Sequence, residues 1–252
     1  MAQELFNDGN HICVVFRDLV KGSAVQANQF LVVDGGHAAI IDPGGELTYA
    51  RLFMALSQYL NVKGLDYIIA SHQDPDIVAS IHKWLSGTDC KIVVPALWER
   101  FVSHFTKPGR TDNRTIPIPD EGTRLRLGNI QLWALPAHFL HAEGNFQFYD
   151  PVSKILFSGD LGANLPPGNL DKPVTKLAEI MPYMEGFHKR YMNSNKVTRY
   201  WANMVRKLDI KMIVPQHGRA LQGKAIPEFI AWIANLECGV DLMTQDNYSL
   251  PK

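Results

Sequence analysis

The 252-residue chain contains only three cysteines, Cys13, Cys90 and Cys238, and none of them belongs to a CxxC pair. An odd number of widely spaced cysteines argues against a disulfide framework and a thiolate metal site, and it favours a reducing compartment. No apolar run approaches the ~20 residues that a helix needs to span a bilayer. The first ten residues also lack the basic and apolar regions of a secretory signal. The sequence therefore predicts a cytoplasmic protein with no membrane partner.

The chain also lacks an excess of charge of either sign, because 25 basic residues balance 25 acidic ones. A protein that coats a polyanion is usually strongly basic, so a nucleic acid polymer is not an expected partner. The hydrophobic content, in contrast, is 46%. A chain of this length buries roughly three-quarters of its extended surface, which provides a core without cross-links. No linker-like stretch divides it, so we expect residues 1–252 to form a single domain.

Hydrophobic patterning divides the chain into short strands and longer helices. Apolar or alternating segments typical of strands lie at residues 11–20, 30–34, 37–42, 65–71, 91–95, 123–128, 130–137, 146–150, 154–160 and 211–218. Apolar residues recur at helical spacing within 47–60, 77–85, 175–208 and 227–239. The proline-containing stretch 101–121 predicts a long loop that covers part of the site. This order favours two sheets packed face to face with helices outside, rather than a doubly wound sheet.

The segment SHQDPD, at residues 71–76, follows an apolar strand and precedes a helix. His72, Asp74 and Asp76 occupy alternate positions, and in an extended backbone such positions project to one side. One short loop therefore offers an imidazole and two carboxylates to a metal centre. Taken alone, the pattern is equally typical of a solvated loop in which Asp76 caps the next helix.

Three later apolar strands also end at a side chain that binds metals. They are His141 in LHAEGN, Asp160 in ILFSGD and His217 in IVPQHG. Polar side chains at strand ends leave the core and converge on a cleft. A single aspartate of this kind more often caps a turn, and a single histidine is more often a hydrogen-bonded core residue. Found together, the four segments favour one shared metal site.

In this order the segments resemble the metallo-β-lactamase superfamily, whose pattern is H-x-[HED]-x-D, then H-x-x-G-[SN], then an apolar strand ending in G-D, then P-x-H-G. The stretch NQFLVVDGGHAAIIDPGG also resembles the opening strands of that superfamily, and the match spans residues 28–220. The resemblance implies an α/β (α+β) fold, the four-layer αββα sandwich. It also implies two metal ions, with one carboxylate shared between them.

The resemblance assigns a role to each of six ligands. The first metal takes His72, Asp74 and His141, the second takes Asp76 and His217, and Asp160 bridges the two. A bridging carboxylate holds two ions ~3.5–4 Å apart, the separation usual in two-metal sites. Asp76 and Asp160 are also the expected catalytic carboxylates.

Two departures from the hydrolase pattern of this superfamily bear on the metal. Asp74 stands where a histidine is usual, and Ile77 stands in place of a final histidine. Carboxylate-rich sites suit iron or manganese better than the all-nitrogen sites that suit zinc. Ile77 cannot bind a metal, so the second ion has an open position. These features, with FLHAEGNFQFYDPVSKILFSGD, are similar to the di-iron branch, which comprises flavodiiron proteins and stand-alone oxygen-binding relatives. That branch uses H-x-E-x-D, so the shorter Asp74 leaves the geometry of the first metal open.

The first functional hypothesis is a non-haem di-iron protein that binds, senses or reduces dioxygen or nitric oxide. The expected cofactor is a pair of iron ions, with zinc or manganese as substitutes. Flavodiiron reductases add a flavodoxin domain, but this sequence has no Gly-rich loop to hold the phosphate of FMN. We therefore expect no FMN on this chain, and any reductase turnover requires an external electron donor. The resemblance also favours a homodimer.

The second hypothesis is a metal-dependent hydrolase, most plausibly a phosphodiesterase that acts on substrates such as cyclic dinucleotides. Its nucleophile would be a bridging hydroxide whose pKa is lowered by two cations. Phosphate would be held by Lys107, Arg110 and Arg114, or by Lys189 and Arg190, although each is individually typical of surface charge. A third reading, a binding protein with a degenerate site, is disfavoured because all six ligands are present.

Three further residues are expected beside the metals. His138 precedes His141 by three residues and is the alternative ligand at that position, but it fits the H-x-x-G spacing less well. We expect His138 and Tyr191 to face the pocket, although Tyr191 is also typical of a core aromatic. Asp42, in IIDPGG, is expected to accept a hydrogen bond from a ligand imidazole.

Overall fold

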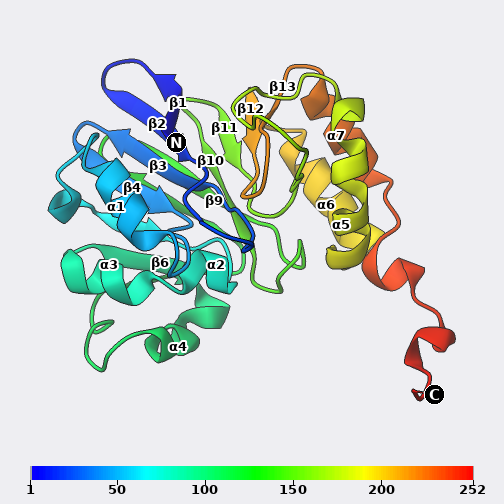
Figure 1. Cartoon of the computed structure of the whole chain (residues 1–252), viewed down its shortest axis with the longest axis horizontal. Helices are drawn as coiled ribbons and strands as arrows, with labels where there is room; N and C mark the ends of the chain where they lie inside the picture. Colours follow the sequence, from blue (N-terminus) through cyan, green and yellow to red (C-terminus); the bar gives the residue numbers. More distant parts are fainter. Residues whose placement is uncertain (1, 252) are drawn as a thin grey trace.

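Two β-sheets packed face to face form the centre of the molecule, and helices cover the outer face of each (Figure 1). The structure is a computed structural model, and it describes residues 2–251. The first sheet has seven strands in sequential order: β1 (Ala2–Asn7), β2 (His11–Phe16), β3 (Gln29–Asp34), β4 (His37–Ile41), β5 (Tyr67–Ile69), β6 (Lys91–Pro95) and β7 (Thr115–Ile118). Strands β1 to β4 pair antiparallel, and β4 to β7 pair parallel.

The second sheet has six strands in the order β13-β12-β11-β10-β9-β8. Their bounds are β8 (Thr123–Leu127), β9 (Ile130–Pro136), β10 (Phe146–Asp150), β11 (Ile155–Phe157), β12 (Met212–Val214) and β13 (Leu221–Gln222). Strands β11 and β12 are the parallel pair of this sheet, so their carboxyl ends lie at the same edge.

Helices divide between the two outer layers (Figure 1). Those beside the first sheet are α1 (Tyr49–Leu56), α2 (Pro75–Val78), α3 (Ile81–Gly87) and α4 (Glu99–Val102). Those beside the second sheet are α5 (Glu185–Tyr191), α6 (Asn195–Val205) and α7 (Ala225–Ala234). Seven short 3-10 helices complete the description: η1 (Val62–Gly64), η2 (Ala96–Trp98), η3 (Ser103–Phe105), η4 (Leu177–Glu179), η5 (Met181–Tyr183), η6 (Gly239–Leu242) and η7 (Gln245–Tyr248). No helix within residues 2–251 is long and apolar enough to cross a bilayer.

Three layers of apolar side chains hold the sandwich together, and strand alternation produces them. In β2, Val15 faces the layer between the sheets, whereas Val14 faces the layer under α1 to α3. The rings of Phe30 and Phe157 meet between the sheets, with centroids 5.0 Å apart. Trp84 fills the outer layer of the first sheet. Full burial of one such large side chain stabilises the fold by roughly 1.5–3 kcal/mol.

The four-layer αββα architecture expected from the sequence is confirmed, and three local predictions were wrong. Strand β1 was missed, because its alternation is weak and every residue of it is at least partly exposed. The expected loop at 101–121 contains part of α4, then η3 and strand β7, which pairs with β6 at the sheet edge. The expected helical stretch 175–208 is interrupted, because the chain bends between α5 and α6.

This topology brings polar residues from both sheets to one edge. The loops after β4 and β5 leave the first sheet, and the loops after β11 and β12 leave the second. Because both pairs are parallel, each pair delivers its two loops at one edge. The motifs that the sequence predicts to bind metal lie in three of these loops and in the β9–β10 connection.

Candidate metal centre

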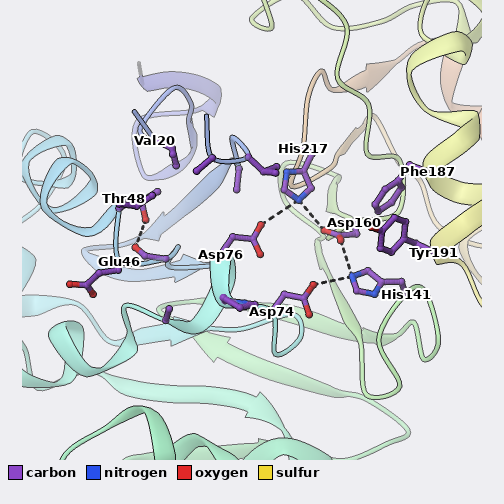
Figure 2. A pocket seen from close by; sticks show the side chains of 17 residues that line it. Val20, Glu46, Thr48, Asp74, Asp76, His141, Asp160, Phe187, Tyr191 and His217 are labelled. Atoms are coloured by element: carbon purple, nitrogen blue, oxygen red, sulfur yellow. Dashed lines mark hydrogen bonds and ion pairs between the residues drawn. The ribbon is translucent and has the colours of Figure 1, made fainter. Parts of the chain in front are cut away.

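The structure brings all six expected ligands together at the meeting edge of the two sheets. Figure 2 shows five of them around one cavity, with dashed lines from the histidines to the carboxylates: Asp74, Asp76, His141, Asp160 and His217. The sixth, His72, does not line the cavity and is buried next to Asp74. Side chains separated by up to 145 sequence positions, from His72 to His217, thus share one centre. Their role as metal ligands is our proposal from this geometry.

Four of these side chains surround one point. One ligand atom from each of His72, Asp74, His141 and Asp160 lies within 4.8 Å of all the others. The Nε2 atom of His141 is 3.0 Å from Asp160 Oδ2 and 3.3 Å from Asp74 Oδ2, and His72 Nε2 is 3.7 Å from Asp74 Oδ2. An ion ~2.1 Å from each atom requires separations of roughly 3–4.2 Å between ligands. The group therefore fits a first metal ion.

The remaining two ligands gather around the other oxygen of Asp160. His217 Nε2 lies 3.5 Å from Asp160 Oδ1 and 3.5 Å from Asp76 Oδ2. Asp160 thus directs Oδ2 to the first group and Oδ1 to the second, which is the arrangement of a bridging carboxylate. His72 Nε2 and Asp160 Oδ1 are buried and have no hydrogen-bond partner within residues 2–251. Since buried polar atoms normally have a partner, these two atoms are suited to bind a cation.

Local structure places the two aspartates of the 71–76 loop. Asp74 has extended backbone geometry and is the N-cap of α2, and Pro75 occupies the first helical turn. The Asp74 carbonyl accepts the first helical bonds, from Ile77 at 2.9 Å and Val78 at 3.0 Å. Ile77 is fully buried beneath this turn. The residue that replaces a usual ligand therefore anchors the loop in the core, and α2 directs Asp76 into the cavity.

The outer nitrogens of two ligand histidines are held by neighbouring groups. His217 Nδ1 lies 2.7 Å from the carbonyl oxygen of Gln26, so it carries the proton and leaves Nε2 free for a metal. His72 Nδ1 is 3.0 Å from Ser71 Oγ. The prediction that Asp42 bonds directly to a ligand imidazole was wrong. Its carboxylate accepts from the Ser71 backbone N–H at 2.9 Å, because the sharp turn at Asp42 aims it at the backbone of the loop.

The charges of the site compensate one another. Burial alone raises the pKa of Asp160, but the neighbouring imidazoles of His141 and His217 outweigh it and bring that pKa well below its usual range. Burial likewise lowers the pKa of His141, but its bonds to Asp160 and Asp74 raise it to about 10. In the absence of metal, protons on the imidazoles therefore take the position of the cations. Metal binding must displace them, so metal affinity falls in acid.

A cavity of about 540 Å³ opens above the ligands. One wall comes from α5, where Phe187 and Tyr191 stack with ring centroids 4.7 Å apart (Figure 2). Val25 and Leu47 contribute apolar surface on the opposite side. Sequence reasoning missed Phe187, although its position four residues before Tyr191 places both on one helix face. Tyr191, which the sequence analysis expected to face the pocket, lines this cavity.

Several expected pocket groups lie elsewhere. His138 does not line the cavity; its Nε2 lies 2.7 Å from the carbonyl oxygen of Asp120, and its ring meets Phe146 edge-on. Residues 101–121 do not line it either, so the expectation of a covering loop there was wrong. Arg114, one of the expected phosphate ligands, instead donates hydrogen bonds to the carbonyls of Leu85, Thr88 and Cys90. Within residues 2–251, no lysine or arginine lines the metal cavity.

A second cluster of potential ligands, remote in the fold, is a structural network. His11 Nε2 is 2.7 Å from Asp150 Oδ2, and His11 Nδ1 is 3.2 Å from Asp34 Oδ1. Cys13 Sγ also donates to Asp150, at 3.3 Å. All of these side chains are buried and hydrogen-bonded. The cluster ties β2 and β3 of one sheet to β10 of the other, and it leaves no ligand atom unpaired.

We predict that the buried His188, on α5, makes the protein less stable in acid. Burial lowers the pKa of this fully buried imidazole to about 4, whereas the unfolded chain titrates near 6.5. The unfolded state therefore binds the proton first, so the contribution is complete above pH ~6.5 and lost as the pH falls towards 4. The metal-free wild type should lose roughly 3 kcal/mol of unfolding free energy from this group in that window. Urea unfolding at about pH 7 and about pH 4.5 measures it.

The matched variant is His188→Gln, since glutamine still accepts from the Gly162 backbone N–H that His188 Nε2 binds at 2.8 Å. We expect this variant to lose clearly less stability than the wild type over the same pH interval. Equal losses in the two proteins would show that another group causes the acid sensitivity.

Comparisons with known proteins identify the family and the fold of the chain. A family model described as ODP family beta lactamase matches residues 25–218. A structure of the apo state of the chemotaxis sensor ODP from T. denticola is 36% identical to the chain, covers 99% of both chains and has a TM-score of 0.87. A structure of the peroxy diiron species of ODP is also 36% identical, covers 98% of this chain and 99% of its own, and has a TM-score of 0.86.

More distant relatives share the fold. A flavoprotein from Thermotoga maritima is 24% identical, with a TM-score of 0.74, and the match covers 92% of this chain and 59% of that one. An uncharacterized protein of Methanocaldococcus jannaschii is 24% identical over 214 residues, 82% of this chain. The chain spans about half, 53%, of that protein's length. The resemblance to the di-iron branch of the metallo-β-lactamase superfamily is confirmed, and the chain belongs to the ODP family of beta-lactamase-fold proteins.

Proposed function

We propose that this chain is a non-haem di-iron protein that binds dioxygen and acts as an oxygen sensor. The observation that carries the proposal is Asp160, whose two oxygens each face a separate group of ligands. Support comes from the chemotaxis sensor ODP, which is 36% identical over nearly the whole chain and is described in a peroxy diiron state.

The donor set supports iron as the resident metal. Three imidazoles and three carboxylates form a mixed nitrogen and oxygen site, which suits iron better than a thiolate or all-imidazole site would. Zinc and manganese remain substitutes that the same ligands accept. Bound iron would supply the electrons for oxygen capture, and Ile77 leaves a position free of protein ligand on the side of Asp76 and His217.

The residues around the ligands control access to the site and the orientation of the ligand imidazoles. The stacked rings of Phe187 and Tyr191 keep bulk water from one side of the ligands. Tyr191 also meets the His141 ring edge-on, with centroids 5.8 Å apart, and so limits the rotation of that imidazole. His217 is fixed by the carbonyl of Gln26. The site therefore presents rigid ligands to a small molecule that enters a cavity lined in part by apolar side chains.

The domain organisation, the compartment and the need for an electron donor follow from the same proposal. We propose that residues 1–252 act as one domain in the cytoplasm, where the buried cysteines Cys13, Cys90 and Cys238 stay reduced. No FMN is assigned to this chain, so repeated reduction of oxygen requires an external donor, whereas reversible binding requires none. A homodimer remains a proposal by analogy.

The decisive test is optical. The protein, loaded anaerobically with ferrous iron to about two ions per chain, should develop a new visible absorption band when air is admitted. The same protein loaded with zinc is the control, because zinc has no accessible redox change and should stay colourless. If the iron-loaded protein shows no spectral change at full metal occupancy, oxygen binding at this site is excluded.

The hydrolase hypothesis uses the same two-metal site, and no other observation within residues 2–251 favours it. Bound metal ions would contact a phosphodiester, but no lysine or arginine of the described chain lines the cavity to bind its remaining charge. Lys189 and Arg190 line a different groove, on the far side of α5. Steady turnover of a cyclic dinucleotide that is lost in the Asp76→Ala variant would revive this hypothesis.

A further inference from the structure

Helix α5 lies between the metal cavity and the last part of the chain. Figure 1 shows α5 beside the C-terminal segment, which we define as residues 238–248. Phe187 and Tyr191 face the metal cavity. Lys189 and Arg190 line a second groove of about 750 Å³, whose other wall is the C-terminal segment. Tyr191 lines both hollows, so they adjoin at this residue of α5.

On its inner side, α5 contacts two loops that carry metal ligands. Tyr191 meets the ring of His141. His188 accepts a hydrogen bond of 2.8 Å from the backbone N–H of Gly162, two residues after the bridging Asp160. Any change in the position of either ligand loop therefore acts directly on this seven-residue helix.

Beyond α5, two backbone hydrogen bonds continue to the C-terminal segment through a single residue, Asn193. The Asn193 N–H donates to the carbonyl of Phe139, at 3.2 Å, and Phe139 lies two residues before His141. The Asn193 carbonyl then accepts from the Val240 N–H at 2.8 Å. The ligand loop and the C-terminal segment are therefore bonded to opposite sides of one peptide segment.

Gly239 makes the close approach at this junction possible. Its φ is +53°, and a Cβ atom there would lie 2.2 Å from the carbonyl oxygens of both Met192 and Asn193. No other residue fits without moving one backbone away from the other. The close packing of this junction thus depends on Gly239, which lies outside the metal site.

We propose that α5 and Asn193 transmit the state of the metal centre to the C-terminal segment. This inference rests on the proposed function only in its last step, the response to oxygen, since metal binding alone already changes what holds the ligands. His141 Nε2 and Asp160 Oδ2 contact each other directly at 3.0 Å, and a bound ion would replace that contact, so the two ligand loops would be held by the ion instead of by each other. Packed elements respond to such local changes by switching between discrete arrangements.

The C-terminal segment is suited to display that change at the surface. Leu242, Met243 and Tyr248 are exposed there, next to the basic side chains of Lys189 and Arg190. When the junction at Asn193 and Val240 shifts, the shape of this groove shifts with it. The output of the sensor is therefore a change in the groove, on the other side of α5 from the metal cavity.

Hydrogen–deuterium exchange of the whole protein tests the proposal. We expect the Val240 amide, followed in a peptide that covers residues 236–248, to change its exchange rate at least about threefold when zinc fills the site. Zinc makes this test independent of oxygen chemistry. Ferrous loading followed by air then tests whether oxygen produces a further change. Unchanged exchange in the zinc-loaded protein at full occupancy would overturn the coupling, whatever the optical experiment shows.

The Gly239→Ala variant separates coupling from metal binding. It should bind zinc with the stoichiometry of the wild type, because Gly239 touches no ligand, and its C-terminal exchange should be the same with and without metal. Gly186→Ala, on α5, is the matched control, because a Cβ there meets nothing within 4 Å. If Gly239→Ala keeps the metal-dependent change in exchange, the junction at Asn193 is not the route.

Discussion

The Asp160→Asn variant should lose most of its bound metal, from about two ions per chain to fewer than about one. Asparagine has nearly the same shape, but it is neutral and offers only one oxygen. Both ligand groups depend on this side chain, since its Oδ2 lies 3.0 Å from His141 Nε2 and its Oδ1 lies 3.5 Å from His217 Nε2. Removal of a partner outside the ligand shell often lowers metal affinity 10–100-fold, so loss of the bridge itself should cost at least ~100-fold.

Metal content of protein reconstituted with ferrous iron and dialysed against a weak chelator measures this effect. Asp209→Asn is the matched control, because that carboxylate is exposed and pairs with Lys154 and Lys211 far from the site. The control should retain wild-type stoichiometry and the wild-type absorption change in air. Retention of both ions with unchanged affinity in Asp160→Asn would disprove the bridging role and, with it, the assignment of the centre.

The Gly218→Ala variant should be the most destabilised of the substitutions considered. Gly218 has φ +92°, and a Cβ there would lie 1.6 Å from the carbonyl oxygen of Asn164. The contact is with backbone, so no side-chain rotation relieves it. His217 and Asn164 are also joined by a backbone hydrogen bond of 3.0 Å, and the Gly218 carbonyl accepts from Asn28. We expect a loss of roughly 3 kcal/mol or more in unfolding free energy, through strain and broken hydrogen bonds.

Urea unfolding of the metal-free proteins gives the size of this loss, and metal content shows its consequence for the second ligand group. The matched control is Gly64→Ala, in η1, where φ is ordinary and a Cβ meets nothing within 4 Å. That control should stay within about 1 kcal/mol of the wild type. If Gly218→Ala unfolds at the wild-type urea concentration, the tight turn after His217 does not have the rigidity that we ascribe to it.

Motif spacing selected six side chains that the structure brings together, because the expected ligands sit at the ends of strands. A strand is recognised from a few apolar residues, and the polar residue that ends it must leave the core. His72, Asp160 and His217 all follow this rule, and the parallel pairs β4–β5 and β11–β12 bring such ends together. The replacement of a ligand by Ile77 could also be read from the sequence, because its position in the motif is fixed.

Prediction was weaker wherever a role depends on the direction of a side chain. Asp42 was expected to bond an imidazole, but its carboxylate reaches the backbone of Ser71 instead. His138 was expected in the pocket, yet it turns to the carbonyl of Asp120. The position of a residue just after a strand does not predict which partner its side chain reaches. A different φ at a loop residue points the side chain in another direction.

The cavity walls required the tertiary structure for a different reason. Phe187 and Tyr191 lie about 50 positions beyond His141 and approach it only because α5 packs across the edge of the second sheet. The stretch 101–121 was the expected wall, since loops rich in proline often border sites. Instead, its strand β7 completes the first sheet beside β6. Helix placement depends on the sum of many core contacts, which no local pattern contains.

By itself, the amino-acid sequence determined the sandwich, the six candidate metal ligands and the preference for iron. These follow from periodicity, from strand ends and from the chemical hardness of carboxylate ligands, all of which are local properties. Only the tertiary structure decided that Phe187 forms part of the cavity wall, that no lysine or arginine lines the cavity within residues 2–251, and that α5 lies between the cavity and the C-terminal segment. Those features arise from packing between residues far apart in the chain, where distance and orientation are set by the whole core.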